Sequence, residues 1–95
     1  MENYELSQAA DEDFENIFEY GIDTFGLDQA LEYQYGMKQR FEELAKQPQL
    51  YQPVDHIHKG YRRSVYGKHS IYYRIESKGI RIMRVLKHQD PAQAF

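Results

Sequence analysis

The spacing of apolar residues changes between Pro48 and Gly60, and this change limits the chain to an α+β fold. Before it, apolar residues recur every three or four positions in two stripes that Gly26 separates. After it come three runs rich in Tyr, Val and Ile, divided by short turns at Gly67-Lys68 and Lys78-Gly79. The runs are Tyr61–Tyr66, Ser70–Glu76 and Ile80–Leu86. The pattern therefore predicts a helical hairpin followed by a three-stranded antiparallel meander.

Both stripes have the spacing of one face of an amphipathic helix, and their ends fit helix boundaries. Ser7 is a suitable N-cap for the first helix, and Pro48 prevents the second from continuing. A short alternation at Tyr4–Leu6 predicts a first strand. The order is then β-α-α-β-β-β, with the hairpin packed on a small antiparallel sheet in one domain, residues 1–95. Gly36 lies inside the second stripe, so we expect it to allow close packing against the first helix. The stripes are Ala10, Phe14, Ile17, Phe18, Ile22 and Phe25, and Leu27, Ala30, Leu31, Met37, Phe41, Leu44 and Ala45.

The composition favours a cytoplasmic protein. The sequence has no cysteine, which excludes disulfides and thiolate chemistry and suits a reducing compartment. Its N-terminal region is acidic rather than basic and apolar, and no run approaches the roughly 18 apolar residues of a membrane span. We therefore expect a soluble chain without a membrane partner.

The charges are unevenly distributed along the chain. Residues 1–58 carry thirteen acidic and three basic residues, a formal charge of −10, whereas residues 59–95 carry nine basic and two acidic residues, +7. One interpretation is a basic surface that meets phosphates or an acidic partner. The other is internal complementarity, in which acidic helices lie beside a basic sheet. Both interpretations stay open on the sequence alone.

The basic residues of the strands form the strongest candidate binding surface. Arginine offers paired donors to phosphate or carboxylate, and neighbouring tyrosines offer faces for stacking. Because side chains alternate between the two faces of a strand, Arg62 and Arg63 are expected to point in opposite directions, and so are Arg81 and Arg84. The alternative is an ordinary solvated strand surface. The last strand is apolar on both alternating faces, so we expect the C-terminal tail or a partner to cover its second face.

No motif predicts a catalytic or cofactor site. The sequence lacks a glycine-rich phosphate loop and a nucleophile elbow. Asp55, His56 and His58 lie close together, but they lack further ligands at a recognisable spacing, so solvated loop histidines are expected rather than a metal site. We expect no metal and no cofactor.

Across about ninety residues the chain resembles the ParE branch of the RelE/ParE superfamily of bacterial toxins. The matching segments are Tyr4-Glu5-Leu6-Ser7, Phe41-Glu42-Glu43-Leu44-Ala45-Lys46-Gln47-Pro48, Gly60-Tyr61-Arg62, Ile71-Tyr72-Tyr73-Arg74 and Ile82-Met83-Arg84-Val85-Leu86-Lys87-His88. The resemblance implies the toxin of a type II toxin–antitoxin system, which inhibits DNA gyrase and blocks replication. A ParD-like antitoxin would neutralise it in a hetero-oligomer, and the toxin would meet DNA only indirectly, through the antitoxin or gyrase.

The resemblance leads to two sets of candidate binding residues. We expect the gyrase-facing surface to comprise Arg62, Arg63, Arg81, Arg84, Lys87, His88 and Phe95. Three aromatic residues outside the helical stripes, Tyr20, Tyr33 and Tyr35, are expected to contact the antitoxin. Under this interpretation the chain has no catalytic residues.

Two alternatives remain. The superfamily's other branch consists of ribosome-dependent mRNA endoribonucleases, whose chemistry needs a general acid, a general base and cations beside the phosphate. In that case Arg62, Arg63, Arg81, Arg84 and His88 would form the catalytic site. The second alternative is a non-toxic binding module with the same fold.

Overall fold

The first strand and the first helix are joined at Ser7. In the computed structural model, which describes residues 3–87, strand β1 spans Tyr4–Leu6 and helix α1 spans Gln8–Phe25. The Ser7 hydroxyl accepts a hydrogen bond from Ala10 N at 3.0 Å, as an N-cap does, and donates one to Met83 O at 2.8 Å. The cap thereby fixes the start of α1 to the sheet.

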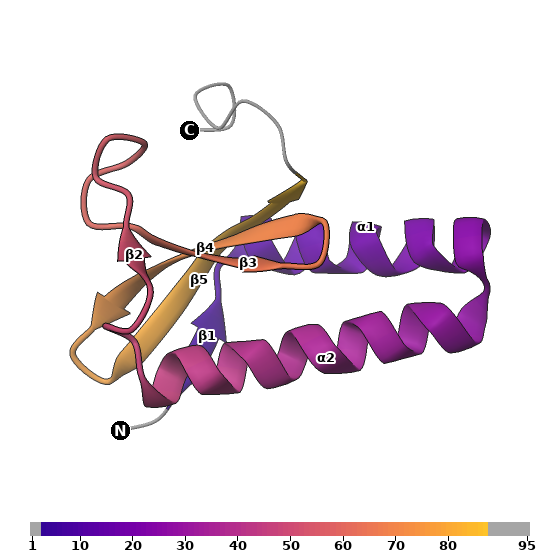
Figure 1. Cartoon of the computed structure of the whole chain (residues 1–95), viewed down its shortest axis with the longest axis horizontal. Helices are drawn as coiled ribbons and strands as arrows, with labels where there is room; N and C mark the ends of the chain where they lie inside the picture. Colours follow the sequence, from indigo (N-terminus) through magenta and orange to yellow (C-terminus); the bar gives the residue numbers. More distant parts are fainter. Residues whose placement is uncertain (1–2, 88–95) are drawn as a thin grey trace.

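The helical hairpin turns at Gly26, where φ is +92°. Helix α2 follows as Leu27–Lys46, and the two helices run side by side past the end of the sheet (Figure 1). They approach closely at Gly21, where an added Cβ would lie 3.2 Å from the Ala30 Cβ. The hairpin predicted from the sequence is therefore confirmed, although a different glycine lies at the contact between the helices.

The sequence pattern predicted close packing at Gly36 but indicated the wrong neighbour. A Cβ added there would collide with the Tyr66 hydroxyl of the sheet rather than with α1. The sequence showed that close packing was needed at this position but could not show which neighbour required it.

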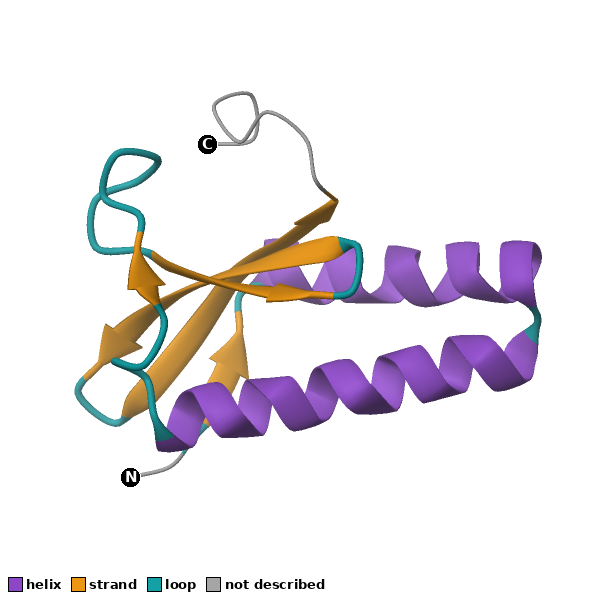
Figure 2. Cartoon of the chain, in the orientation of Figure 1, coloured by secondary structure: helices purple, strands orange, loops and turns teal. Residues whose placement is uncertain are grey.

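The sheet has five strands in the order β1-β5-β4-β3-β2 (Figure 2). The later strands are β2 (Gln52–Pro53), β3 (Arg62–Tyr66), β4 (His69–Glu76) and β5 (Gly79–Lys87). The predicted meander is β3-β4-β5, and the α+β class is confirmed. Two features differ from the expected antiparallel sheet. Strand β1 pairs parallel to β5. Strand β2 adds an edge strand that the sequence did not predict, because it has two residues and one of them is proline.

Apolar residues fill both faces of the sheet. The main core lies between the sheet and the hairpin and includes the fully buried Met37, Phe41, Ile71 and Tyr73. On the opposite face, which we call the outer face, Val54 and Tyr61 from the β2–β3 loop pack against Tyr72, Leu86 and Met83. This loop covers part of the second face of β5, and the C-terminal tail, which was also expected from the sequence to cover that face, lies outside the described residues.

Among the residues that the structure describes, no strand pairs with the edge of β3 beyond its short pairing with β2. Val65 is half exposed there. Arg40 of α2 reaches this edge and donates to Ser64 Oγ and to Val65 O, each at 2.8 Å. The same guanidinium lies over the rings of Tyr51 and Tyr66. Arg40 thus attaches helix α2 to the edge of strand β3.

Candidate binding groove

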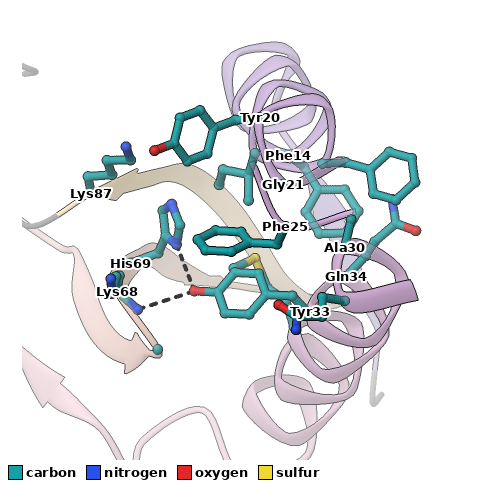
Figure 3. A pocket seen from close by; sticks show the side chains of 15 residues that line it. Phe14, Tyr20, Gly21, Phe25, Ala30, Tyr33, Gln34, Lys68, His69 and Lys87 are labelled. Atoms are coloured by element: carbon teal, nitrogen blue, oxygen red, sulfur yellow. Dashed lines mark hydrogen bonds between the residues drawn. The ribbon is translucent and has the colours of Figure 1, made fainter. Parts of the chain in front are cut away.

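An apolar groove of about 700 Å3 lies between the free end of the hairpin and the β3–β4 turn (Figure 3). The buried Phe14 and Met37 line it, whereas Tyr20 and Phe25 are 52% and 57% exposed. The hairpin creates this space because it extends beyond the sheet and leaves its inner face uncovered. A volume of this size is ample for the side chains of a partner.

The Tyr33 hydroxyl joins α2 to the turn that forms one wall of the groove. It donates to Tyr66 O at 3.0 Å, lies 2.7 Å from His69 Nδ1 and accepts from Lys68 N at 3.2 Å (Figure 3). Burial raises the pKa of Tyr33, and the hydrogen bond from Lys68 N opposes part of that effect. This hydroxyl therefore holds the turn in place against the helix.

Two lysines lie at the rim of the groove. Lys87, the last residue of β5, places its ammonium 4.2 Å from the centre of the Tyr20 ring. Lys68 lies at the β3–β4 turn beside Tyr33 (Figure 3). The groove thus combines an apolar lining with a cationic edge, which suits a segment with apolar side chains and carboxylates.

The strand arginines are engaged largely with acidic residues of the same chain. Arg84 makes a paired contact with Asp13, Nε to Oδ2 at 2.7 Å and Nη2 to Oδ1 at 3.0 Å, and this bonding raises the pKa of Arg84. Arg81 contacts Glu5 at 3.0 Å and Glu76 at 3.3 Å. Internal complementarity therefore explains part of the charge asymmetry.

Four arginines nevertheless share the outer face. The register places Arg63 and Arg84 on either side of Tyr72, and Arg74 opposite Arg81. The expectation that Arg81 and Arg84 point in opposite directions was wrong, because a register shift beside Tyr72 and Tyr73 resets the alternation of β5. The opposite orientation of Arg62 and Arg63 holds, since Arg62 is opposite Tyr73 of the core face.

The neighbouring positions Arg62 and Arg63 differ in their surroundings. Arg62 donates to the carbonyls of Tyr51 at 2.6 Å and Gln49 at 3.4 Å, which fixes the segment after α2. Arg63 is half-buried, and its side chain makes no hydrogen bond or ion pair within residues 3–87. Of the arginines on the outer face, Arg63 is the one whose charge the described chain leaves unengaged.

Comparisons with known proteins agree with this architecture. Residues 4–91 match the family model described as the ParE toxin of the type II toxin–antitoxin system parDE. The chain belongs to the ParE toxin family. It is 33% identical over 94 residues to Toxin ParE1 of Caulobacter vibrioides, covering 99% of this chain and 97% of that protein. It is 36% identical over 87 residues to Toxin ParE1 of Mycobacterium tuberculosis, covering 90% and 88%.

A solved structure titled as the chromosomal ParDE system of P. aeruginosa has the same fold. The TM-score is 0.79, with 18% sequence identity and coverage of 94% of this chain and 98% of that one. At this identity the likeness establishes the fold, and family membership follows from the sequence matches. The chain is thus a type II toxin of the ParE family.

The ParE fold places two of the three tyrosines predicted for antitoxin contact in the groove. Tyr20 and Tyr33 line it, whereas Tyr35 lies outside it, 65% exposed, and its hydroxyl accepts a hydrogen bond from Gln39. Sequence reasoning missed Phe25, Met37 and His69 as lining residues. Helical spacing assigns an apolar face to the core, and nothing in the sequence shows where the sheet beneath that face ends.

The remaining predicted positions are not all gathered on one surface. Lys87 lies at the groove, Arg62 points to the core side, and Arg63, Arg81 and Arg84 lie on the outer face. His88 and Phe95 fall outside the described residues. Within 3–87 no group of three metal-binding side chains occurs, and His58 stacks on Tyr61 with ring centres 3.9 Å apart. None of the helices in that range has the length and apolar character to span a membrane.

Proposed function

We propose that this ParE-family toxin inhibits DNA gyrase by binding it, without catalysis of its own, in the cytoplasm. Family membership supports the proposal, since the resemblance noted in the sequence implies this target. The engagement of Arg81 and Arg84 supports a binding mechanism over RNA cleavage. A nuclease needs guanidinium groups free to meet a phosphate, whereas these two are paired with carboxylates.

The outer face of the sheet is the proposed target surface. Arg63 contributes an unengaged charge there. Arg74, Arg81 and Arg84 start from the same face, but their guanidinium groups are paired with Glu76, Glu5 and Asp13. Lys87 lies at the rim of the groove rather than on the outer face, and His88 and Phe95, which fall outside the described residues, stay candidates from the sequence. Arg62 contributes indirectly, because its bonds to Tyr51 O and Gln49 O hold the strand edge.

The apolar groove is the proposed antitoxin site. A segment of a ParD-like antitoxin would place large apolar side chains between Tyr20 and Tyr33 and carboxylates near Lys68 and Lys87. The single observation that carries this assignment is a groove of about 700 Å3 left open in the described chain. Monomeric proteins seldom leave an apolar surface of this kind uncovered without a partner.

Two parallel reactions with the purified chain, refolded away from its antitoxin, test the function. The expected result is inhibited supercoiling of plasmid DNA by gyrase, with linear DNA accumulating, and unaffected cell-free translation. Blocked translation with mRNA cut on ribosomes would overturn the proposal in favour of the nuclease. A folded chain that changes neither reaction would also overturn it.

A further inference from the structure

His69 is a buried titratable residue to which the proposed function gives no role. It is the first residue of β4, 7% exposed, and it lines the groove opposite Lys87 of β5. Its ring packs against that of Tyr33 with centres 5.6 Å apart, and its Nδ1 lies 2.7 Å from the Tyr33 hydroxyl (Figure 3). His69 therefore contacts the hydroxyl that joins α2 to the β3–β4 turn.

The contacts of the Tyr33 hydroxyl decide which nitrogen of His69 carries the proton. A tyrosine hydroxyl has one proton to donate and two lone pairs with which to accept. Its proton goes to Tyr66 O at 3.0 Å, because a carbonyl has none to offer. One lone pair accepts from Lys68 N at 3.2 Å. The remaining contact, 2.7 Å to Nδ1, then needs a proton on that nitrogen.

The opposite assignment leaves two oxygens facing each other. If Nδ1 carried no proton, the Tyr33 hydroxyl would donate to it and would have nothing to donate to Tyr66 O. Two acceptor oxygens would then lie 3.0 Å apart in a partly buried place, which destabilises the fold by an unmade hydrogen bond. The distances thus favour the tautomer with the proton on Nδ1.

We propose that His69 is a positioning residue of the groove, which acts through Tyr33. Its Nδ1–H holds the Tyr33 hydroxyl in the orientation that donates to Tyr66 O and accepts from Lys68 N. The β3–β4 turn, which forms one wall of the groove, is thereby fixed against α2. For its part in binding, this inference rests on the proposed antitoxin site.

The turn and the helix meet too closely for the Tyr33 ring to move alone. Gly67 opens the two-residue turn with φ of +55°, and a Cβ added there would lie 2.5 Å from the Tyr33 hydroxyl. A displaced hydroxyl therefore displaces the turn and, with it, Lys68 at the rim. His69 thus controls the place of a rim cation that it does not carry itself.

Nitrogen-15 NMR of the full chain with labelled histidine tests the tautomer. The expected spectrum shows Nδ1 of His69 as a protonated nitrogen near neutral pH, with the resonance assigned by its loss in His69→Asn. An unprotonated Nδ1 in the folded chain would overturn the proposal.

Two amide variants test the positioning role without any antitoxin. The side-chain nitrogen of asparagine is bonded to Cγ, as Nδ1 is, whereas glutamine carries its nitrogen one bond further, close to the place of Nε2. Amide exchange at Lys68 N, taken relative to Ile71 N in the buried part of β4, reports the turn separately from global stability.

The relative exchange of Lys68 N should be about tenfold faster in His69→Gln than in the parent chain. In His69→Asn it should stay within about threefold of the parent, because this variant keeps a donor at the Nδ1 position. Equal relative exchange in the two folded variants would contradict a role for the Nδ1 donor.

Titration with the cognate antitoxin separates this inference from the proposed antitoxin site. His69→Gln should weaken binding about tenfold and His69→Asn less than about threefold. Adding Tyr33→Phe to His69→Gln should cause no further loss, because both act through one hydroxyl.

The two readouts fail in different ways. If Lys68 exchange responds but the affinity does not, the turn is held by His69 while the antitoxin binds elsewhere, and the role of His69 in binding is overturned together with the antitoxin site. If Tyr33→Phe weakens the antitoxin but neither readout responds to His69→Gln, the antitoxin site stands and the inference about His69 fails.

Discussion

Asp13 and Arg84 lie 71 residues apart in the sequence, and their side chains join α1 to β5 through two hydrogen bonds of 2.7 and 3.0 Å. The same Asp13 carboxylate accepts a third hydrogen bond, 3.0 Å long, from Val85 N. Val85 comes after the register shift, in the part of β5 beyond the three residues that pair with β1. One acidic residue of the helix thus satisfies both a side chain and the irregular strand edge.

Asp13→Ala should therefore destabilise the chain. It removes the partner of a partly buried guanidinium and leaves Val85 N without its acceptor, for an expected loss of about 1–3 kcal/mol in the free energy of unfolding. Urea unfolding measures the loss. A cycle with Arg84→Met separates the ion pair from the backbone bond, and a loss below about 0.5 kcal/mol would mean that solvent already satisfies these groups.

Tyr73 should limit stability at alkaline pH. Its ring is fully buried, its hydroxyl donates to Pro48 O at 2.7 Å, and burial raises its pKa from 10.0 to about 12. A raised pKa in the folded state gives stability that is complete below pH 10 and is lost as the pH rises toward about 12.

The variant Tyr73→Phe isolates this effect. At neutral pH it should lose about 1 kcal/mol, because the hydrogen bond to Pro48 O disappears. Above pH 10 the difference in stability between the parent chain and the variant should shrink. In the parent, unfolding exposes the Tyr73 hydroxyl, which then ionises and favours the unfolded state, whereas the variant has no such group. Urea unfolding from pH 8 to 11.5 measures it, and a constant difference would refute the assignment.

Gly36→Ala should lower the melting temperature although it replaces glycine within a helix. Helix propensity alone would stabilise the variant by about 1 kcal/mol. The new Cβ, however, overlaps the Tyr66 hydroxyl of β3, and overpacking typically costs about 1–3 kcal/mol. Adding Tyr66→Phe should recover part of the loss. Scanning calorimetry of the parent chain and these two variants decides the order, and a higher melting temperature for Gly36→Ala than for the parent would show that Tyr66 simply moves aside.

Tyr33→Phe should weaken antitoxin binding about tenfold, while Tyr35→Phe should not change it. The first substitution removes the hydroxyl that fixes the β3–β4 turn through Tyr66 O, His69 and Lys68 N. The second removes a hydroxyl outside the groove. Isothermal titration with the cognate antitoxin makes the comparison. Equal affinities for the two variants would remove the groove as the antitoxin site.

Arg63→Ala should reduce gyrase inhibition at least fivefold without changing stability by more than about 0.5 kcal/mol, because the Arg63 side chain makes no hydrogen bond or ion pair within the described chain. Lys46→Ala, an exposed base in the last turn of α2, is the matched control. Supercoiling assays at equal protein concentration measure the effect. Undiminished inhibition by Arg63→Ala would exclude it from the target surface.

Local features of the sequence were enough to predict the helices and the meander. Ser7 and Gly26 delimit α1 as Gln8–Phe25. The turns at Gly67-Lys68 and Ser77-Lys78 separate strands whose ends lie within one residue of the predicted runs. Capping, helical spacing and hairpin turns depend on residues close together in the chain, so a single sequence reveals them.

Features that depend on distant segments were not predictable in the same way. Pairing of β1 with β5 joins the two ends of the chain. The register shift beside Tyr72 lies within the β4–β5 pairing, and no residue of the sequence signals it. Sequence alternation placed Arg81 and Arg84 on opposite faces because it assumes a regular strand. The groove was missed, except for Tyr20 and Tyr33, because an uncovered helix face has the same spacing as a covered one.

The hydrogen bonds of Arg40 at the edge of β3 affect how readily such a toxin aggregates when its partner is not bound. An open β-strand edge can pair with the edge of another molecule and begin a growing aggregate. Beyond β2, the edge of β3 carries the half-exposed Val65. The Arg40 guanidinium donates a hydrogen bond to the Val65 carbonyl, so that acceptor is already engaged by a charged group. A second strand would have to displace that cation before it could add to the sheet. The chain is thereby protected from edge-to-edge polymerisation during the interval in which it acts alone.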